Sequence, residues 1–137
     1  MEHSTELEEL SRRLMESMVA GDTTAFERFF DTDHRVLFIG SDPSEWWDDR
    51  DKVVTALRAQ LLEMKGKVQI TPNDVVAYTE GDWGWAALNC TFSAGGNESP
   101  FRVSIVLSRR DDGWKIVQGH ASAGVLNEDT VGFKLTT

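Results

Sequence analysis

Residues 113–125, Gly-Trp-Lys-Ile-Val-Gln-Gly-His-Ala-Ser-Ala-Gly-Val, predict a β-strand near the end of the chain. Side chains on a strand point alternately to its two faces. One face is therefore expected to carry five residues of this stretch: Trp114, Ile116, Gln118, His120 and Ser122. This face begins with apolar residues and becomes polar along the chain. Such a gradient is typical of a strand that runs from the closed end of a cavity towards its mouth.

Three further strands precede this one in the second half of the chain. They are expected at Val68–Glu80, with a bend near Pro72, at Trp83–Phe92 and at Phe101–Arg109. Gly and Asp residues mark the turns after the first and third of these strands. Consecutive strands joined by short turns form an antiparallel meander.

The first half of the chain predicts three amphipathic helices. The first spans Glu6–Ala20, with Gly21 as its expected C-terminal stop, and the third runs from about Arg50 to Lys65. The short second helix has an aromatic face, which we assign to the core. Capping boxes are expected at the starts of the first two helices: Thr5 with Glu8, and Thr24 with Glu27.

A short strand, Arg35–Ile39, and a loop, Gly40–Asp49, lie between the second and third helices. Pro43 and small polar residues argue against regular structure in this loop. The loop nevertheless carries the adjacent tryptophans Trp46 and Trp47, and exposing both rings to water would be costly. We therefore expect the loop to be tied to the core or to a pocket.

Helices followed by a meander predict one α+β domain over residues 1–137, in which the helices cover one face of the sheet. The other face is also partly apolar. On the last strand it is expected to carry small or apolar residues: Val117, Ala121, Ala123 and Val125. A second apolar face usually meets another sheet or a partner subunit. We therefore expect a homodimer formed through the outer face of the sheet.

Composition and charge argue against several classes of protein. The net charge of −9 disfavours nucleic-acid binding, which requires neutralised phosphates. No apolar run approaches the roughly 18 residues of a membrane span, so no membrane partner is expected. Cys90 is the only cysteine, which excludes an intrachain disulfide and suits the cytoplasm. Metal-ligand spacing is absent among His3, His34 and His120, so we predict no metal and no cofactor.

Three segments carry a resemblance to a known family. They are residues 38–47 (Phe-Ile-Gly-Ser-Asp-Pro-Ser-Glu-Trp-Trp), 81–87 (Gly-Asp-Trp-Gly-Trp-Ala-Ala) and 113–122 (Gly-Trp-Lys-Ile-Val-Gln-Gly-His-Ala-Ser). With the order of the elements, they resemble the SnoaL-like group of the nuclear transport factor 2-like superfamily over about residues 5 to 130.

This resemblance implies a cone-shaped fold. A strongly curved antiparallel sheet would wrap around the three N-terminal helices and leave a cavity open at one end. It also implies a dimer. It implies no single activity, because the superfamily includes isomerases, cyclases, dehydratases, epoxide hydrolases and non-catalytic binding modules, so the site must be argued from its own residues.

Six residues are candidates for binding a ligand in the cavity: Trp46, Trp47, Trp85, Asn89, Gln118 and His120. The strand that holds Trp85 and Asn89 has a second face, with Ala86, Leu88 and Cys90, that is equally able to be the inner one. His120 is the candidate general acid or base, because histidine titrates near neutrality. Asp42, a candidate to orient substrate, and Glu45 are the acidic residues expected to reach the mouth.

Three hypotheses about function follow. The first is a domain that binds a small apolar or aromatic molecule between sheet and helices. The second is an enzyme of the isomerase, cyclase or hydrolase type that uses His120 as its acid or base. The third is a structural dimerisation module whose cavity is filled by side chains.

Overall fold

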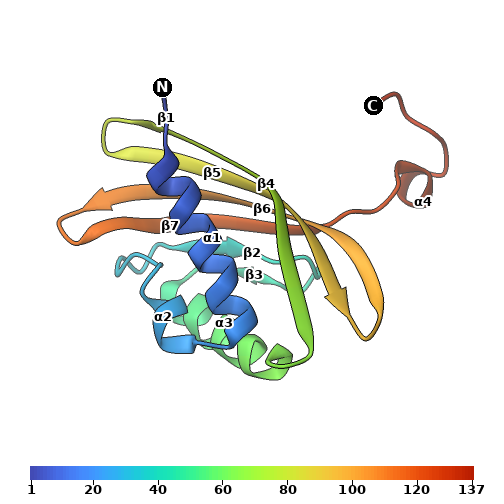
Figure 1. Ribbon diagram of the computed structural model, residues 1–137, viewed down its shortest axis with the longest axis horizontal. Helices are drawn as coiled ribbons and strands as arrows, with labels where there is room; N and C mark the ends of the chain where they lie inside the picture. Colours follow the sequence, from blue (N-terminus) through green and yellow to red (C-terminus); the bar gives the residue numbers. More distant parts are fainter.

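The computed structural model of residues 1–137 contains a seven-stranded sheet, curled around three helices (Figure 1). The strands are β1 (Glu2–His3), β2 (Leu37–Ile39), β3 (Trp46–Trp47), β4 (Val68–Glu80), β5 (Trp83–Ala94), β6 (Asn97–Arg110) and β7 (Gly113–Ala123). The helices are α1 (Thr5–Ala20), α2 (Thr23–Glu27), α3 (Arg50–Met64) and α4 (Asn127–Val131). This arrangement confirms the α+β cone that the sequence predicts.

The sheet has the order β1-β4-β5-β6-β7-β2-β3. Its centre is the expected meander, in which β4 to β7 pair antiparallel with their neighbours. β2 extends the sheet by pairing parallel with β7, and β1 pairs with the other edge. The bend predicted near Pro72 is present, because one extra residue interrupts the register of β4 between Pro72 and Asp74.

The loop predicted between β2 and α3 contains one further strand. β3 pairs antiparallel with β2, which places Trp46 opposite Ile39 and Trp47 opposite Phe38. The expected irregular structure remains on either side of this strand, in the turn where the amide of Glu45 donates to the carbonyl of Asp42 and at Asp48 and Asp49 before α3. The two tryptophans are thus held by a hairpin at the edge of the sheet.

The caps of the first two helices differ from the prediction. Ser4, one residue before Thr5, accepts a hydrogen bond from the amide of Leu7 at 3.2 Å. Asp22 accepts one from the amide of Ala25 at the start of α2. Both residues are good N-caps, and each precedes the residue that we assigned. No helix of the structure is long and apolar enough to cross a membrane.

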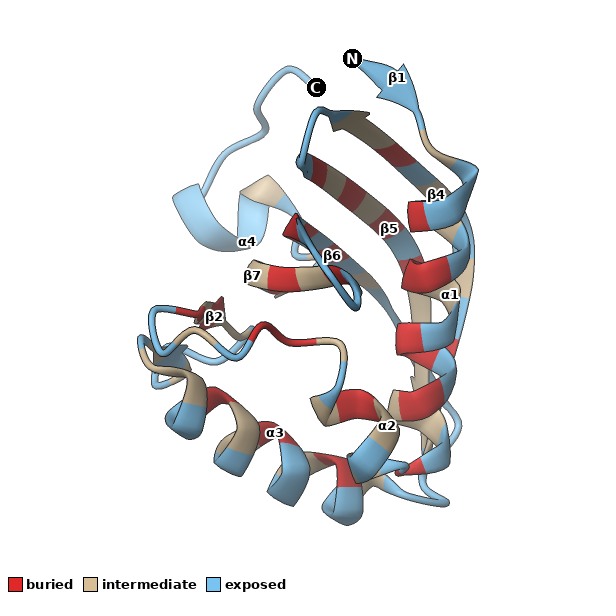
Figure 2. Cartoon of the chain, turned by 90° about the vertical axis from the view of Figure 1, so that its left-hand side faces the viewer, coloured by how far each residue is buried: buried red, intermediate tan, exposed pale blue.

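The helices pack on the concave side of the sheet (Figure 2). α1 contacts β4 and β5, α3 contacts β2 and β3, and α2 lies between the two helices. Together these elements enclose one core of 22 buried apolar residues. Beyond β7 the chain leaves the sheet, and α4 stands apart from it (Figure 1).

A β-bulge interrupts β7 in its middle. Leu107 of β6 lies opposite Ile116, and the next residue of β6, Val106, lies opposite Gln118, so Val117 is an extra residue. The extra residue exchanges the two faces of the strand. Ile116 is fully buried on the concave side, and Gly119 and Ala121 are buried on that side after the bulge.

This bulge overturns our assignment of faces on β7. Gln118, His120 and Ser122 do not share a face with Trp114 and Ile116, but lie on the outer face of the sheet. Ala121, expected on the outer face, is 7% exposed and points towards the helices. The side chains of β7 alternate between the two faces as predicted only as far as Ile116. An extra residue in a strand shifts every later side chain to the opposite face.

Gly119 occupies a position where a larger residue does not fit. A Cβ atom there would lie 2.5 Å from Cε2 of Phe38, because the Phe38 ring crosses the strand at this point. We expect Gly119→Ala to lower the free energy of unfolding by about 1–3 kcal/mol, the usual cost of overpacking a core. Urea unfolding followed by tryptophan fluorescence measures this loss.

Thr55→Ser is the control for this change. Thr55 is exposed on α3, outside the cavity and away from the outer face of the sheet. Its replacement should change the free energy of unfolding by no more than about 0.5 kcal/mol. Equal losses in the two variants would contradict the tight contact between Gly119 and Phe38.

Candidate functional site

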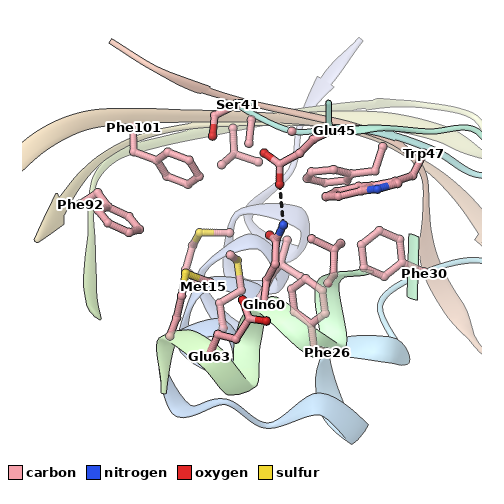
Figure 3. Close-up of a pocket in the computed structure, with 18 residues that line it drawn as sticks. Met15, Phe26, Phe30, Ser41, Glu45, Trp47, Gln60, Glu63, Phe92 and Phe101 are labelled. Atoms are coloured by element: carbon pink, nitrogen blue, oxygen red, sulfur yellow. Dashed lines mark hydrogen bonds between the residues drawn. The ribbon is translucent and has the colours of Figure 1, made fainter. Parts of the chain in front are cut away.

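A cavity of about 370 Å³ lies between the sheet and the helices (Figure 3). It is lined by 18 residues, of which 13 are hydrophobic. They come from α1, α2 and the segment after it, α3, the β2–β3 hairpin and the inner faces of β5, β6 and β7: Leu14, Met15, Met18, Phe26, Phe30, Phe38, Gly40, Ser41, Glu45, Trp47, Leu57, Gln60, Glu63, Met64, Phe92, Phe101, Val103 and Ala121.

Aromatic rings make up much of the wall. The hairpin brings Phe38 and Trp47 together as a stacked pair with ring centres 6.2 Å apart. Neighbouring strands β5 and β6 bring Phe92 and Phe101 together at 5.7 Å. Figure 3 shows the second pair on the opposite side of the cavity from Trp47. The cavity is therefore suited to flat or apolar molecules.

One carboxylate projects into this apolar space. Glu45 precedes β3, and its Oε1 accepts a hydrogen bond from the amide of Asp42 at 2.8 Å. Its Oε2 accepts one from Nε2 of Gln60 on α3, so Glu45 and Gln60 point towards one another across the cavity (Figure 3). Gly40 makes room for this side chain, since a Cβ there would lie 2.6 Å from Cβ of Glu45.

The remaining polar residues of the cavity lie at its rim. Ser41 and Glu63 are exposed, and Glu63 extends from the last turn of α3. Neither Glu45 nor Glu63 forms an ion pair. No lysine, arginine or histidine lines the cavity. Its charge is therefore negative.

Asp42 lies outside the cavity and is exposed. Its Oδ1 accepts hydrogen bonds from the amide and the hydroxyl of Ser44, at 2.9 and 2.6 Å. These bonds hold the pKa of the Asp42 carboxyl below its ordinary value. The carboxylate that we assigned to orient substrate is thus used to fix the turn, and its own amide positions Glu45.

The two adjacent tryptophans have different surroundings. Trp47 is half-buried and lines the cavity, whereas Trp46 is 60% exposed and does not. Alternation along β3 accounts for this difference, because consecutive side chains point to opposite faces. Of the six residues proposed to bind a ligand, Trp47 alone lines the cavity between sheet and helices.

Trp85, Asn89, Gln118 and His120 lie on the outer face of the sheet instead. Trp85 packs against Tyr78, with ring centres 5.4 Å apart, and Nδ2 of Asn89 donates to Asp74 at 3.2 Å. Their position follows from the bulge in β7 and from the choice of the inner face on β5. There the face with Ala86, Leu88 and Cys90 is buried, because its smaller residues admit the helices.

His120 and Asn89 line a separate, shallow groove of about 300 Å³ on this outer face. Asp74 and Arg102 lie in the same groove, so it holds charges of both signs. Elsewhere, no group of three or more His, Cys, Asp or Glu side chains is arranged to hold a metal ion.

Comparison with known protein families identifies the family of this chain. A family model described as a SnoaL-like domain matches residues 7–126. The chain belongs to the SnoaL-like family. The comparison with curated proteins gives no significant match.

Solved structures share the fold of this SnoaL-like domain. A nuclear transport factor 2-like superfamily protein from Salmonella enterica serovar Typhimurium LT2 has a TM-score of 0.78 and 19% identity, over 93% of this chain and 95% of that one. A protein of unknown function from Pseudomonas putida KT2440 has a TM-score of 0.76 and 14% identity, over 93% and 94%. A candidate dehydratase from Streptomyces avermitilis has a TM-score of 0.74 and 19% identity, over 84% and 91%.

Sequence reasoning missed most of the wall of the SnoaL-like domain's cavity. Phe92 and Phe101 were placed on strands without a role, and Gln60 was not considered. The aromatic face of α2 was assigned to the core, and Phe26 and Phe30 serve both the core and the cavity. Glu45 and Asp42 were the acidic residues expected to reach the mouth, and of these two Glu45 lines the cavity.

Cys90 is 1% exposed on the inner face of β5, and burial raises the pKa of its thiol. A buried thiol in an apolar environment forms little of the reactive thiolate. We expect the native SnoaL-like domain to react very slowly with a thiol reagent such as dithionitrobenzoate at mildly alkaline pH. Reaction should become fast and stoichiometric in denaturing urea, and fast labelling of the native protein would contradict the burial.

Proposed function

We propose that this protein binds a small, largely apolar or aromatic molecule in the cavity between its sheet and helices. The observation that carries the proposal is the open volume of about 370 Å³ inside an aromatic wall. This volume falls in the range of about 300–1,000 Å³ typical of small-molecule sites, which are mostly apolar with a few placed polar groups. Glu45, Gln60 and Ser41 supply such groups here.

The two alternatives have less support. An enzyme that uses His120 as its acid or base would need that side chain at the cavity, whereas His120 is exposed on the opposite face of the sheet. A filled cone would leave no open volume. The similarity to a candidate dehydratase is a similarity of fold at 19% identity and supplies no catalytic residue.

The adjacent tryptophans provide a matched test of this site. We expect N-phenylnaphthylamine, an uncharged dye that fluoresces in apolar surroundings, to bind the native protein. Trp47→Ala should weaken its affinity about tenfold, roughly 1.4 kcal/mol of lost apolar contact. Trp46→Ala should leave the affinity unchanged, because Trp46 lies outside the cavity. Fluorescence titration gives the dissociation constants.

A blocking variant tests the same site without removing a contact. Ala121 lines the cavity from β7, so Ala121→Leu should fill part of the space and reduce dye binding. Thermal unfolding checks that each variant remains folded. Equal weakening by Trp46→Ala and Trp47→Ala would place the dye on the surface and contradict the proposal.

We further propose that the outer face of the sheet forms a homodimer. Exposed apolar side chains support this, since Val76 is 37% and Val106 is 36% exposed on that face. Asp74 and Arg102 lie beside them, and their opposite charges suit a two-fold contact in which each surface meets itself. Trp83, 56% exposed at the start of β5, extends the apolar surface.

Sedimentation velocity tests the dimer. The wild-type protein should sediment as a dimer at micromolar concentration, and Val106→Asp should sediment as a monomer, because it places a charge in the contact. Leu62→Asp is the control, since Leu62 is 58% exposed on α3, away from the sheet. A wild-type monomer, or equal dissociation of the two variants, would contradict the proposed interface.

A further inference from the structure

The charge of the cavity restricts the ligands that it can accept. Its two ionisable lining residues are both acidic, Glu45 inside and Glu63 at the rim. No basic side chain lines it, and neither carboxylate has an ion-pair partner. An anionic ligand would therefore meet repulsion without compensation.

Glu45 is held in place by donors that carry no charge. The amide of Asp42 binds one oxygen, and the side-chain amide of Gln60 binds the other. Each carboxylate oxygen has further acceptor capacity. Removing a carboxylate from water is costly unless it is paired, so a ligand that excludes water from Glu45 must supply hydrogen-bond donors, and a positive charge supplies the most.

The rest of the wall also favours a cation. Positive groups are attracted to the faces of aromatic rings, most strongly to tryptophan. Trp47 lies on one side of Glu45, and Phe92 and Phe101 lie on the other (Figure 3). At long range, the net charge of −9 attracts cations to the molecule as a whole.

We propose that the ligand is an amphiphilic amine whose apolar or aromatic body lies against the rings and whose ammonium group binds Glu45. This inference rests on the proposed function, because it assigns the chemical class of the molecule in the same cavity. Glu45 accepts a hydrogen bond from the ammonium group and balances its positive charge. Glu63 adds electrostatic attraction at the entrance.

Three matched compounds test the assignment: phenylbutylamine, phenylbutanol and phenylbutanoate. They share a phenyl ring and a chain and differ in the charge of the end group. Displacement of N-phenylnaphthylamine measures their affinities. We expect the amine to bind about tenfold more tightly than the alcohol, in line with the strength of a hydrogen bond between charged groups. The carboxylate should bind more weakly than the alcohol.

Glu45→Gln removes the charge and keeps the shape of the side chain. It should abolish the preference for the amine over the alcohol while leaving the affinity for the alcohol within about twofold, because the uncharged contacts remain. Glu63→Gln should reduce the preference by a smaller factor. Glu9→Gln is the control for net charge, since Glu9 lies on α1 outside the cavity. Glu9→Gln should leave the order of the three affinities unchanged.

Salt dependence gives a second measurement. The affinity of the wild-type protein for the amine should fall as salt is added, whereas the affinity of Glu45→Gln for the amine should change much less. The affinity for the alcohol should depend little on salt concentration in either protein.

The outcomes separate the two proposals. Tight binding of the alcohol with no preference for the amine, or a preference for the carboxylate, would overturn the charge assignment and leave the apolar site intact. A preference for the amine that survives in Glu45→Gln would also overturn it. Failure of the dye and all three compounds to bind would overturn the proposed function and the inference together.

Discussion

The extra residue Val117 in β7 determines which side chains face the helices. Before it, Trp114 and Ile116 point into the core, and after it Gly119 and Ala121 do. The backbone of Ile116 is hydrogen-bonded to the segment that follows α2, since its amide donates to the carbonyl of Phe29 and its carbonyl accepts from the amide of Asp31. Asp31, 4% exposed, also pairs with Arg110 of β6. The segment after α2 and the ends of β6 and β7 are thus tied together near the bulge, and beyond it the small side chain of Ala121 lines the cavity.

Two close contacts at glycines then give the cavity its shape. The ring of Phe38 crosses β7 at Gly119, and the side chain of Glu45 folds over Gly40. A Cβ atom at either glycine would displace the group that it meets. Both contacts involve the β2–β3 hairpin, so this short segment supplies an aromatic wall and the acidic group together.

The resemblance of three segments to the SnoaL-like group implied the cone, and periodicity in the sequence was enough to predict the helices and the meander. It failed for the site, because the inner face of a strand is known only if alternation is unbroken. Gly119 is a residue type that often accompanies a bulge or a close approach to the backbone, but a glycine alone does not locate the extra residue, so Gln118 and His120 were assigned to the wrong face. On β5 the two faces were equally plausible, and packing against α1 decided between them. Glu45 was expected, together with Asp42, only to reach the mouth, and its contact with Gln60 depends on how the hairpin packs on α3, which the sequence pattern does not give.

The structure separates the parts that form the fold from the part that determines ligand chemistry. Strands β5 to β7 and the helices supply apolar walls, whose residues also belong to the core and cannot change freely. The one charge inside the cavity comes from the turn before β3, which is fixed by Ser44, Asp42 and the amide of Gln60. A turn residue can change its chemistry without altering the packing of the sheet. A substitution at position 45 can therefore change the charge of the ligand that the cavity prefers without changing the shape of the fold. In this protein, position 45 carries a carboxylate.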